Sequence, residues 1–249
     1  MTSKTIVITG GSRGIGAATA LLAGRRGWSV ALSYVGNDKA AKESVAAVEA
    51  AGGRAIAVKG NAAAEGDVAL LFDAAVKAFG PIDGVVNNAG VVASTSTLAD
   101  MTYERIRGLI DVNVVGALLV AREAVRRMAR SRGGRGGVLV NLSSAAARLG
   151  GTNQYVDYAA SKGAIDTLTI GLSREVGGEG VRVNAVRPGL IETDLHASGG
   201  EPGRAQKLGV TTPLGRAGTA EEVGEAIVWL LSDAASYVTG AILDVSGGR

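Results

Sequence analysis

The sequence predicts an α/β fold in which helices cover both faces of a parallel sheet. Short runs of Val, Ile, Ala and Leu alternate with longer Ala-rich stretches along the whole chain. The short runs are apolar at consecutive positions, which indicates strands that are buried on both faces. The 38 glycines follow no collagen-like period and suit many tight turns. Such alternation of strand and helix is typical of a parallel sheet between two layers of helices.

Seven apolar runs are expected to form the strands of this sheet. The first run starts almost at the N-terminus, and the others follow at intervals that leave room for helices. The expected strands contain residues 6–8, 30–32, 55–58, 84–86, 138–140, 181–183 and 241–243.

Helices are expected between the strands because the intervening stretches are long and rich in Ala, the best helix former. Asp38 is expected to cap the second helix, and the Gly/Arg-rich run 132–137 ends the longest one. No linker divides the chain, so residues 1–249 are expected to form a single domain. The expected helices span residues 14–26, 38–51, 66–79, 102–131, 158–178 and 219–232.

Residues 190–214 break this rhythm and are expected to form a substrate lid. The segment is rich in Gly and follows the sixth expected strand, at the sheet edge where open α/β folds bind ligands. Leu190, Ile191, Leu195 and Leu208 could close over a substrate as apolar cover. A fixed pair of short surface helices is the alternative interpretation of this segment.

The composition excludes several classes of function. The formal net charge of +3 and the lack of a Lys/Arg run argue against a nucleic-acid partner. No apolar stretch reaches membrane-spanning length, and no signal peptide precedes the first strand, so a cytoplasmic location is expected. The chain has no Cys and a single histidine, His196, which argues against a metal site or a Ser-His triad.

A glycine-rich segment at residues 9–16 joins the first strand to the first helix with the spacing G-x-x-x-G-x-G. Glycines permit a tight turn there, and the helix N-terminus offers free N–H groups to a pyrophosphate. The segment therefore predicts a dinucleotide site, although a purely structural turn uses the same residues. The expected contacts are Gly10, Ser12, Arg13, Gly14, Ile15 and Gly16.

Two residues favour NADP(H) over NAD(H) as the cofactor. NAD-preferring sites usually place a carboxylate at the end of the second strand, where this chain has Tyr34. Arg13 could bind a 2′-phosphate through its planar guanidinium. Arg13 could instead be an ordinary exposed loop arginine, so NAD(H) remains possible.

Tyr158 and Lys162 lie four residues apart at the start of an expected helix, and so share one face of it. Bringing a phenol of pKa about 10 to half ionisation at neutral pH requires about 4 kcal/mol, of which a nearby ammonium supplies part. Such a pair can exchange a proton with a substrate oxygen. Taken alone, this spacing is common on helices.

An ordered set of motifs, however, resembles the short-chain dehydrogenase/reductase superfamily over essentially the whole chain. The resemblance implies a single-domain Rossmann fold with a doubly wound, seven-stranded parallel sheet, and it also implies a homotetramer. The matching motifs are the glycine segment 9–16, Asn87-Asn88-Ala89-Gly90, Asn113, Ser143-Ser144, Tyr158 with Lys162, and Pro188-Gly189.

The resemblance also implies roles for these residues. Tyr158 is expected to protonate the substrate oxygen, Ser144 to donate a hydrogen bond to it, and Lys162 to tune Tyr158 and bind the nicotinamide ribose. Asn113 is expected to hold a water that links Lys162 to solvent, and Thr193 to contact the carboxamide. Further expected cofactor contacts are Asn61, Asn88, Ala89, Gly90, Pro188, Gly189 and Ile191.

Two features depart from the family pattern. Ser144 lies 14 residues before Tyr158, one more than expected, so Ser143 is the alternative catalytic serine and residues 149–153 are expected to hold the extra residue. Asn61 stands where the family often has an Asp that contacts adenine, but an amide can form the same hydrogen bond.

The predicted function is NADPH-dependent reduction of a small carbonyl compound, or oxidation of the matching secondary alcohol. An NAD-linked sugar or alcohol dehydrogenase is the enzymatic alternative, and a cofactor-sensing protein without chemistry is the other. The helix after Tyr158 is apolar around much of its circumference, which gives a physical reason to expect burial in a homo-oligomer.

Overall fold

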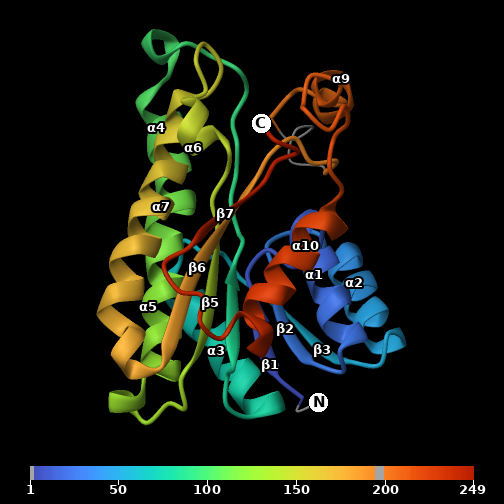
Figure 1. The fold of residues 1–249 in the computed structure, drawn as a ribbon, viewed down its shortest axis with the longest axis vertical. Coiled ribbons are helices and arrows are strands. Elements are labelled where there is room, and N and C mark those ends of the chain that lie inside the picture. Colours follow the sequence, from blue (N-terminus) through green and yellow to red (C-terminus); the bar gives the residue numbers. More distant parts are fainter. Residues whose placement is uncertain (1–2, 194–198) are drawn as a thin grey trace.

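A computed structural model of the chain describes residues 3–193 and 199–249. Its centre is a sheet of seven parallel strands in the order β3-β2-β1-β4-β5-β6-β7 (Figure 1). This confirms the predicted single-domain, doubly wound fold. The chain leaves in opposite directions from the neighbouring strands β1 and β4, which creates the switch point where such sheets bind ligands. The strands are β1 (Thr5–Ile8), β2 (Ser29–Tyr34), β3 (Arg54–Lys59), β4 (Gly84–Asn87), β5 (Gly137–Leu142), β6 (Val181–Pro188) and β7 (Ile242–Val245).

Helices cover both faces of the sheet. Helices α1, α2 and α10 share one hydrophobic cluster with the strands, and α3, α5 and α7 share another on the opposite face (Figure 1). The helices are α1 (Gly14–Arg25), α2 (Asp38–Ala50), α3 (Glu65–Phe79), α4 (Tyr103–Ile110), α5 (Ala117–Met128), α6 (Ala146–Leu149), α7 (Val156–Val176), α9 (Arg204–Gly209) and α10 (Ala220–Leu231).

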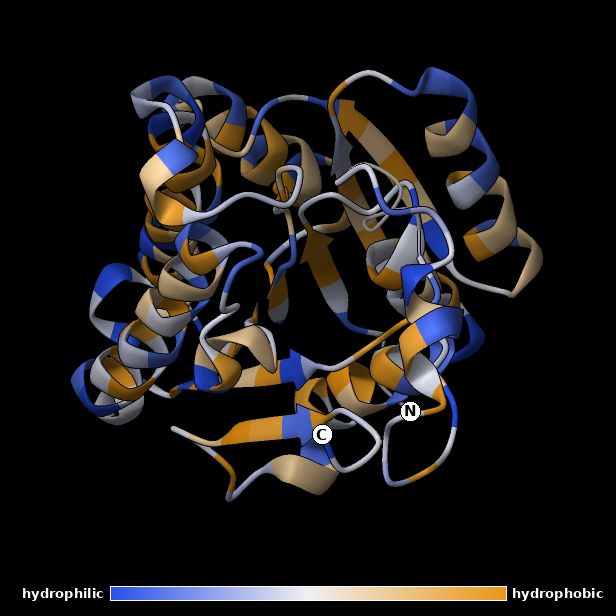
Figure 2. Cartoon of the chain, turned by 90° about the horizontal axis from the view of Figure 1, so that it is seen from above, coloured by the Kyte–Doolittle hydropathy of each residue, from blue (hydrophilic) through white to orange (hydrophobic). Residues whose placement is uncertain are grey.

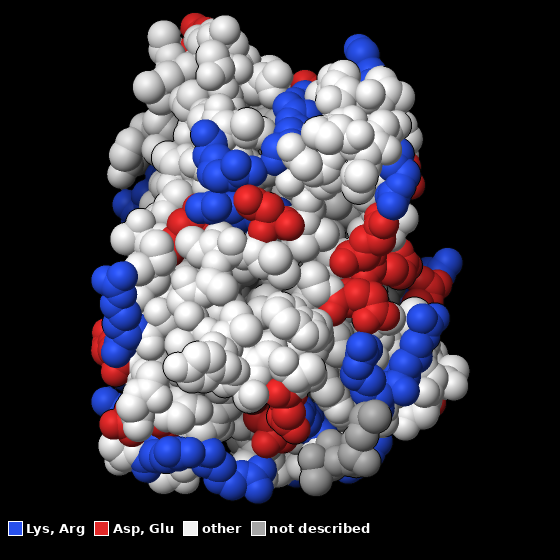
Figure 3. All heavy atoms as spheres, in the orientation of Figure 1, with Lys and Arg blue, Asp and Glu red and all other residues white. Residues whose placement is uncertain are grey.

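The colouring by hydropathy follows this layering. Most strand residues are hydrophobic, whereas polar positions concentrate on the outer sides of the helices (Figure 2). On the face seen in Figure 3, basic and acidic side chains lie close to one another rather than forming a field of one sign. Among the helices that the structure describes, none is both long and apolar enough to cross a membrane.

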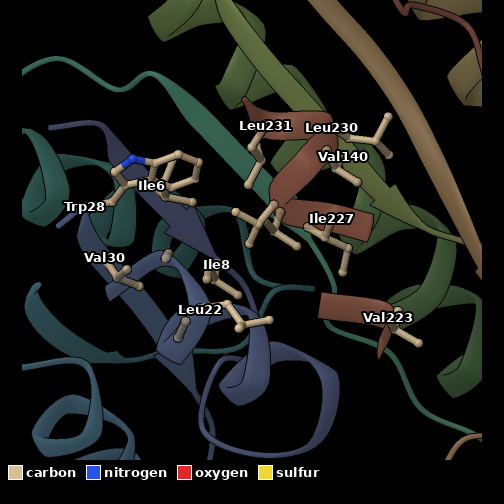
Figure 4. Packing of buried hydrophobic residues seen from close by; sticks show 14 of the residues in the cluster. Ile6, Ile8, Leu22, Trp28, Val30, Val140, Val223, Ile227, Leu230 and Leu231 are labelled. Atoms are coloured by element: carbon tan, nitrogen blue, oxygen red, sulfur yellow. The ribbon is translucent and has the colours of Figure 1, made fainter. Parts of the chain in front are cut away.

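Close packing of α1 against α10 explains the small residues in these helices. Ile6, Ile8 and Val30 of the sheet pack with Leu22 of α1 and Ile227 of α10 (Figure 4). A Cβ atom added at Gly224 of α10 would lie only 2.9 Å from the Cδ1 atom of Leu22.

The segment expected as a helix, residues 102–131, is helical from Tyr103 to Met128 but is not a regular α-helix throughout. It consists of α4, a π-helical turn η2 (Asp111–Gly116), α5, and a separate 3₁₀ turn (Arg130–Arg132). A π turn inserts an extra residue and usually accompanies a functional site. Gly116, the last residue of this turn, lies close to the loop after β3, because a Cβ atom there would be 3.0 Å from the Ala62 carbonyl oxygen.

Two smaller expectations are also corrected. The cap of α2 is Asn37, whose side chain accepts a hydrogen bond from the Ala40 amide, whereas Asp38 is the first helical residue. Helix α7 begins at Val156 rather than at Tyr158.

Within the segment 190–214, the described residues include helix α9, while Leu195 and His196 lie outside the described residues.

Candidate active site

A cavity of about 640 Å³ opens at the carboxyl ends of the strands, over the switch point. The loops after β1, β2, β3, β4, β5 and β6 all contribute to its wall. It brings together the predicted residues Gly10, Ser12, Arg13, Gly14, Ile15, Tyr34, Asn61, Asn88, Ala89, Gly90, Ser144, Tyr158, Lys162, Pro188, Gly189, Ile191 and Thr193. Gly16 and Asn113 do not line it.

The loop after β1 is locked to the loop after β4. The Asn88 side-chain amide donates to the carbonyl oxygens of Thr9 (2.8 Å) and Gly10 (3.0 Å). The Thr9 hydroxyl in turn accepts hydrogen bonds from the backbone amides of Asn88 and Ala89, both at 3.0 Å. Asn88 therefore fixes the shape of the glycine loop as well as bordering the cavity.

The glycines of this loop serve different purposes. Gly10 and Gly14 have positive φ values of 64° and 55°, which favour glycine. Gly16 has a packing role instead, since a Cβ atom there would lie 2.3 Å from the Gly10 carbonyl oxygen. The result is a bare backbone loop that leads into the N-terminus of α1, where no side chain caps the helix. These features fit a pyrophosphate group.

The far end of the cavity is lined by Arg13, Tyr34 and Asn61. Arg13 is exposed, and among the described residues its guanidinium has no hydrogen-bond or ion-pair partner. The Tyr34 hydroxyl hydrogen-bonds Asp38, and the Asp38 carboxylate lies 3.5 Å from the ammonium of Lys59. The Asn61 side chain accepts from the Ala63 amide at 3.0 Å and so stabilises its own turn.

Tyr158 and Lys162 lie on the first turns of α7, and both are buried. Burial raises the pKa of Tyr158 to about 12, against a smaller opposing effect of its hydrogen bond with Ser144. Burial lowers the pKa of Lys162 to about 8. The ammonium nitrogen of Lys162 donates to the Leu142 carbonyl at 2.8 Å and lies 5.6 Å from the centre of the Tyr158 ring. In the protein alone, burial therefore keeps the phenol protonated at neutral pH.

The two serines after β5 point to different partners. The Ser143 hydroxyl donates to the Lys162 carbonyl at 3.2 Å and is buried. Ser144 lines the cavity and hydrogen-bonds Tyr158, while its oxygen accepts from the Ala146 amide at 3.1 Å. The structure thus brings Ser144, rather than Ser143, to the tyrosine.

A tight turn between α6 and α7 accommodates the longer spacing from Ser144 to Tyr158. Gly150, Gly151 and Asn153 have positive φ values of 78°, 63° and 56°. Asn153 is the one residue other than glycine with positive φ in the described part of the chain.

Asn113, on the π turn, is buried beside the cavity wall. Its side-chain oxygen accepts from the Val91 amide at 2.8 Å, and its nitrogen donates to the Val91 carbonyl at 2.9 Å and to the Ser161 hydroxyl at 3.2 Å. A Cβ atom at Gly90 would lie 3.3 Å from the Asn113 oxygen and 3.5 Å from the Lys162 nitrogen. Asn113 therefore anchors the loop after β4 to α7.

One end of the cavity is apolar and contains residues that were not predicted from the sequence. Val92, Leu149 and Tyr155 line it, and the Tyr155 ring meets the Tyr158 ring edge to face at 5.8 Å. The guanidinium of Arg204 from α9 lies 5.4 Å from the centre of the Tyr155 ring and donates to the Tyr155 hydroxyl at 3.1 Å. The position of Tyr155 three residues before Tyr158 was the available signal, whereas no sequence pattern indicated Arg204.

Comparisons with known proteins identify relatives along almost the whole chain. A family profile described as enoyl-(acyl carrier protein) reductase matches residues 10–249. The uncharacterized oxidoreductase YgfF of Escherichia coli is 52% identical, with 98% of both chains covered. The 3beta-hydroxysteroid dehydrogenase 1 of Eggerthella lenta is 40% identical, over 98% of this chain and 93% of that one.

The likeness extends to solved structures. A short-chain dehydrogenase from Burkholderia cenocepacia, in complex with NADP, superimposes with a TM-score of 0.89 and 32% sequence identity, over 98% of this chain and 97% of the other. From its fold, the composition of its cavity and these relatives, the chain belongs to the short-chain dehydrogenase/reductase superfamily of NAD(P)-dependent oxidoreductases, which act on hydroxyl and carbonyl groups.

Proposed function

We propose that this protein is an NADPH-dependent carbonyl reductase, which also oxidises the corresponding secondary alcohol. The observation that carries the proposal is the buried Tyr158 phenol on the cavity wall, hydrogen-bonded to Ser144 and adjacent to Lys162. A general acid must be protonated at the working pH, and the raised pKa of Tyr158 satisfies this for reduction.

We assign the following roles to these residues. When bound, the nicotinamide cofactor supplies a hydride to the carbonyl carbon or accepts one from the alcohol. Tyr158 donates its proton to the substrate oxygen as negative charge develops there. Ser144 donates a hydrogen bond to the same oxygen. The ammonium of Lys162 stabilises the tyrosinate that remains, and Asn113 keeps the neighbouring loop in place.

The same cavity suits the rest of a dinucleotide. The pyrophosphate would lie against the backbone of Ser12, Gly14 and Ile15 at the N-terminus of α1. Thr193 lies beside the glycine loop, where a Cβ atom at Gly14 would be 3.5 Å from its methyl carbon. Among the described residues the guanidinium of Arg13 has no partner, and position 34 carries no carboxylate. Both observations support NADP(H) as the preferred cofactor.

The test is a panel of ketones and secondary alcohols assayed by nicotinamide absorbance with both cofactors. We expect turnover of at least one ketone with NADPH and loss of that turnover in Tyr158→Phe. A protein that binds NADPH but turns over no member of a broad panel would instead be a cofactor sensor.

One observation favours an NAD-linked alcohol or sugar dehydrogenase as the second candidate. Asp38 hydrogen-bonds the Tyr34 hydroxyl, which places a carboxylate near the end of β2. Lys59 pairs with that carboxylate at 3.5 Å, and an ion pair repels a phosphate less than a free carboxylate does. Titration of wild type and Arg13→Ala with both oxidised cofactors decides between the candidates. Weaker NADP binding in the variant, with NAD binding unchanged, supports the first.

A homotetramer is proposed as the working form. Apolar side chains remain exposed on the outer faces of η2, α5 and α7 within the single chain, at Val115, Leu118 and Ile170. Exposed apolar groups on neighbouring helices are suited to burial across a two-fold axis.

A further inference from the structure

A row of side chains with alternating charge crosses the edge of the sheet next to the proposed catalytic residues. The Asp166 carboxylate on α7 accepts hydrogen bonds from the Arg187 guanidinium on β6 at 3.0 and 2.7 Å. Arg187 lies 3.8 Å from Asp244 on β7, and Asp244 lies 3.3 Å from Arg148 on α6. The inner end of this row is buried and its outer end is accessible to solvent.

Asp166 follows Lys162 by one helical turn, so the two residues share one face of α7 with Cβ atoms about 5–6 Å apart. Both are buried, with 8% and 5% of their surface exposed. Arg187 donates only to Oδ2 of Asp166, and in the described structure the buried Oδ1 atom has no hydrogen-bond partner. The carboxylate thus has one oxygen held by Arg187 and one oxygen without a hydrogen bond from any described residue, on the helix face that it shares with Lys162.

The other groups around Lys162 do not supply such a charge. Asp157, next to Tyr158, is paired with Arg105 of α4 at 2.9 and 3.3 Å. The neighbouring groups of η2 and β5 are neutral, namely the Asn113 amide, the Leu142 carbonyl and the Ser143 hydroxyl. Tyr158 is neutral while it is protonated. Among the described residues, the Asp166 carboxylate is the charged group that opposes the effect of burial on the pKa of Lys162.

We propose that Asp166 is a positioning residue for the reaction: its carboxylate, held by Arg187, keeps the buried side chain of Lys162 as an ammonium ion beside Tyr158. The inference rests on the proposed function, because an ammonium stabilises a tyrosinate and a neutral amine does not. No proton passes through Asp166. Asp166 contributes a negative electrostatic potential at Lys162, and the positive charge of Arg187 partly cancels that potential.

Two variants should shift the titration of Lys162 in opposite directions. Asp166→Asn removes the negative charge and keeps the shape, so the pKa of Lys162 should fall by about one unit. Arg187→Gln removes the positive charge that offsets the Asp166 carboxylate, so the pKa of Lys162 should rise. Asp244→Asn, at the outer end of the row, is the matched control and should change the pKa much less. The first readout is NMR titration of protein labelled at the lysine ε carbon, with the Lys162 signal assigned by its loss in Lys162→Arg.

The second readout is the pH profile of kcat/KM for the best ketone. If Asp166→Asn shifts the apparent pKa of one limb of this profile, Arg187→Gln should shift the same apparent pKa in the opposite direction. Structural damage lowers rates without opposite shifts. If Asp166→Asn does not fold, Arg187→Gln alone still tests whether the pKa of Lys162 shifts in the expected direction. Unchanged titration in both variants, shifts of the same sign, or an equal shift in Asp244→Asn would overturn the proposal. The NMR readout needs no turnover, so it remains valid even if Tyr158→Phe disproves the proposed function.

Discussion

At the scale of single residues, burial drives the two central groups in opposite directions. Tyrosine becomes charged when it loses its proton, whereas lysine is charged as long as it keeps its proton. A buried site disfavours both charged forms. The pKa of Tyr158 therefore rises to about 12, and that of Lys162 falls to about 8. Near neutral pH the site contains a protonated phenol beside a largely protonated amine. This arrangement suits proton donation, and it leads to two predictions.

The first prediction concerns Tyr158→Phe. The substitution removes only the hydroxyl, so proton transfer to the substrate is lost while the cavity keeps its shape. We expect kcat to fall by a factor of about 10²–10⁴, with the dissociation constant of NADPH little changed. Steady-state kinetics and fluorescence titration of NADPH measure the two quantities. Turnover close to that of the wild type would remove Tyr158 from the mechanism.

The second prediction concerns the pH dependence of stability. Between pH 8 and 10.5 the unfolded chain holds a proton at Lys162 that the folded chain has released. The free energy of unfolding should therefore rise with pH through this window, by on the order of 3 kcal/mol from this residue alone. Denaturant unfolding at several pH values, with Lys162→Met as the reference, isolates the contribution. A constant difference between wild type and variant across the window contradicts it.

The sequence alone identified those site residues whose motif lies within a short stretch of the chain. Tyr158 and Lys162 share a helix face at a fixed spacing, and the glycine loop adjoins a strand and a helix. The choice between Ser143 and Ser144 needed the structure, in which the Ser143 hydroxyl donates to the Lys162 carbonyl and the Ser144 hydroxyl meets Tyr158. Asp166 was not found because its partner, Arg187, lies 21 residues away on another element.

At the scale of elements, the strands and most helices were predictable, and the π turn within the segment 103–128 was not. The periodicity of apolar residues differs little between an α-helix and a helix with one π turn. The π turn carries Asn113, whose side chain pairs with the backbone of Val91 on another part of the chain. Its position was therefore invisible in the sequence, even though Asn113 itself was identified.

The third prediction tests the packing of α1 against α10. A methyl group at Gly224 would lie 2.9 Å from Leu22 and 3.3 Å from the Thr19 backbone nitrogen. Gly224→Ala should therefore lower the free energy of unfolding by about 1–2 kcal/mol. Gly108→Ala in α4 is the control, since a Cβ atom there meets nothing within 4 Å. It should be neutral or stabilising, by up to about 1 kcal/mol. Equal effects of the two substitutions would contradict this account of the interface.

The fourth prediction concerns the proposed substrate lid. Helix α9 has only six residues. Its Arg204 connects it to the cavity wall through Tyr155 and the side-chain oxygen of Gln154. We expect peptides covering residues 199–214 to gain protection from hydrogen exchange when cofactor and a ketone bind, because closure excludes water from the reaction. Strong protection in the free protein, unchanged by ligands, would instead favour fixed surface helices.

At the scale of the whole molecule, the order of the strands decides where the chemistry can occur. Seven parallel strands direct their carboxyl ends to one edge, so loops from six of them meet over the switch point between β1 and β4. Residues as distant as Gly10 and Thr193 thereby line one cavity. One of the two helical layers that flank the sheet, formed by η2, α5 and α7, carries the exposed apolar residues Val115, Leu118 and Ile170.

The last prediction follows from those exposed residues. Leu118 of α5 and Ile170 of α7 have 48% and 39% of their surface exposed in the single chain, although both are large and apolar. If they pack across a two-fold axis, a charge placed there must be buried without a partner, which costs several kcal/mol per interface. Leu118→Glu with Ile170→Glu should therefore convert a tetramer to dimers or monomers at micromolar concentration, as measured by light scattering. Leu70→Glu on α3 makes a matched control, because Leu70 is 59% exposed and belongs to a different helix. A wild-type protein that is monomeric under these conditions, or a double variant that remains tetrameric, would contradict the proposed assembly.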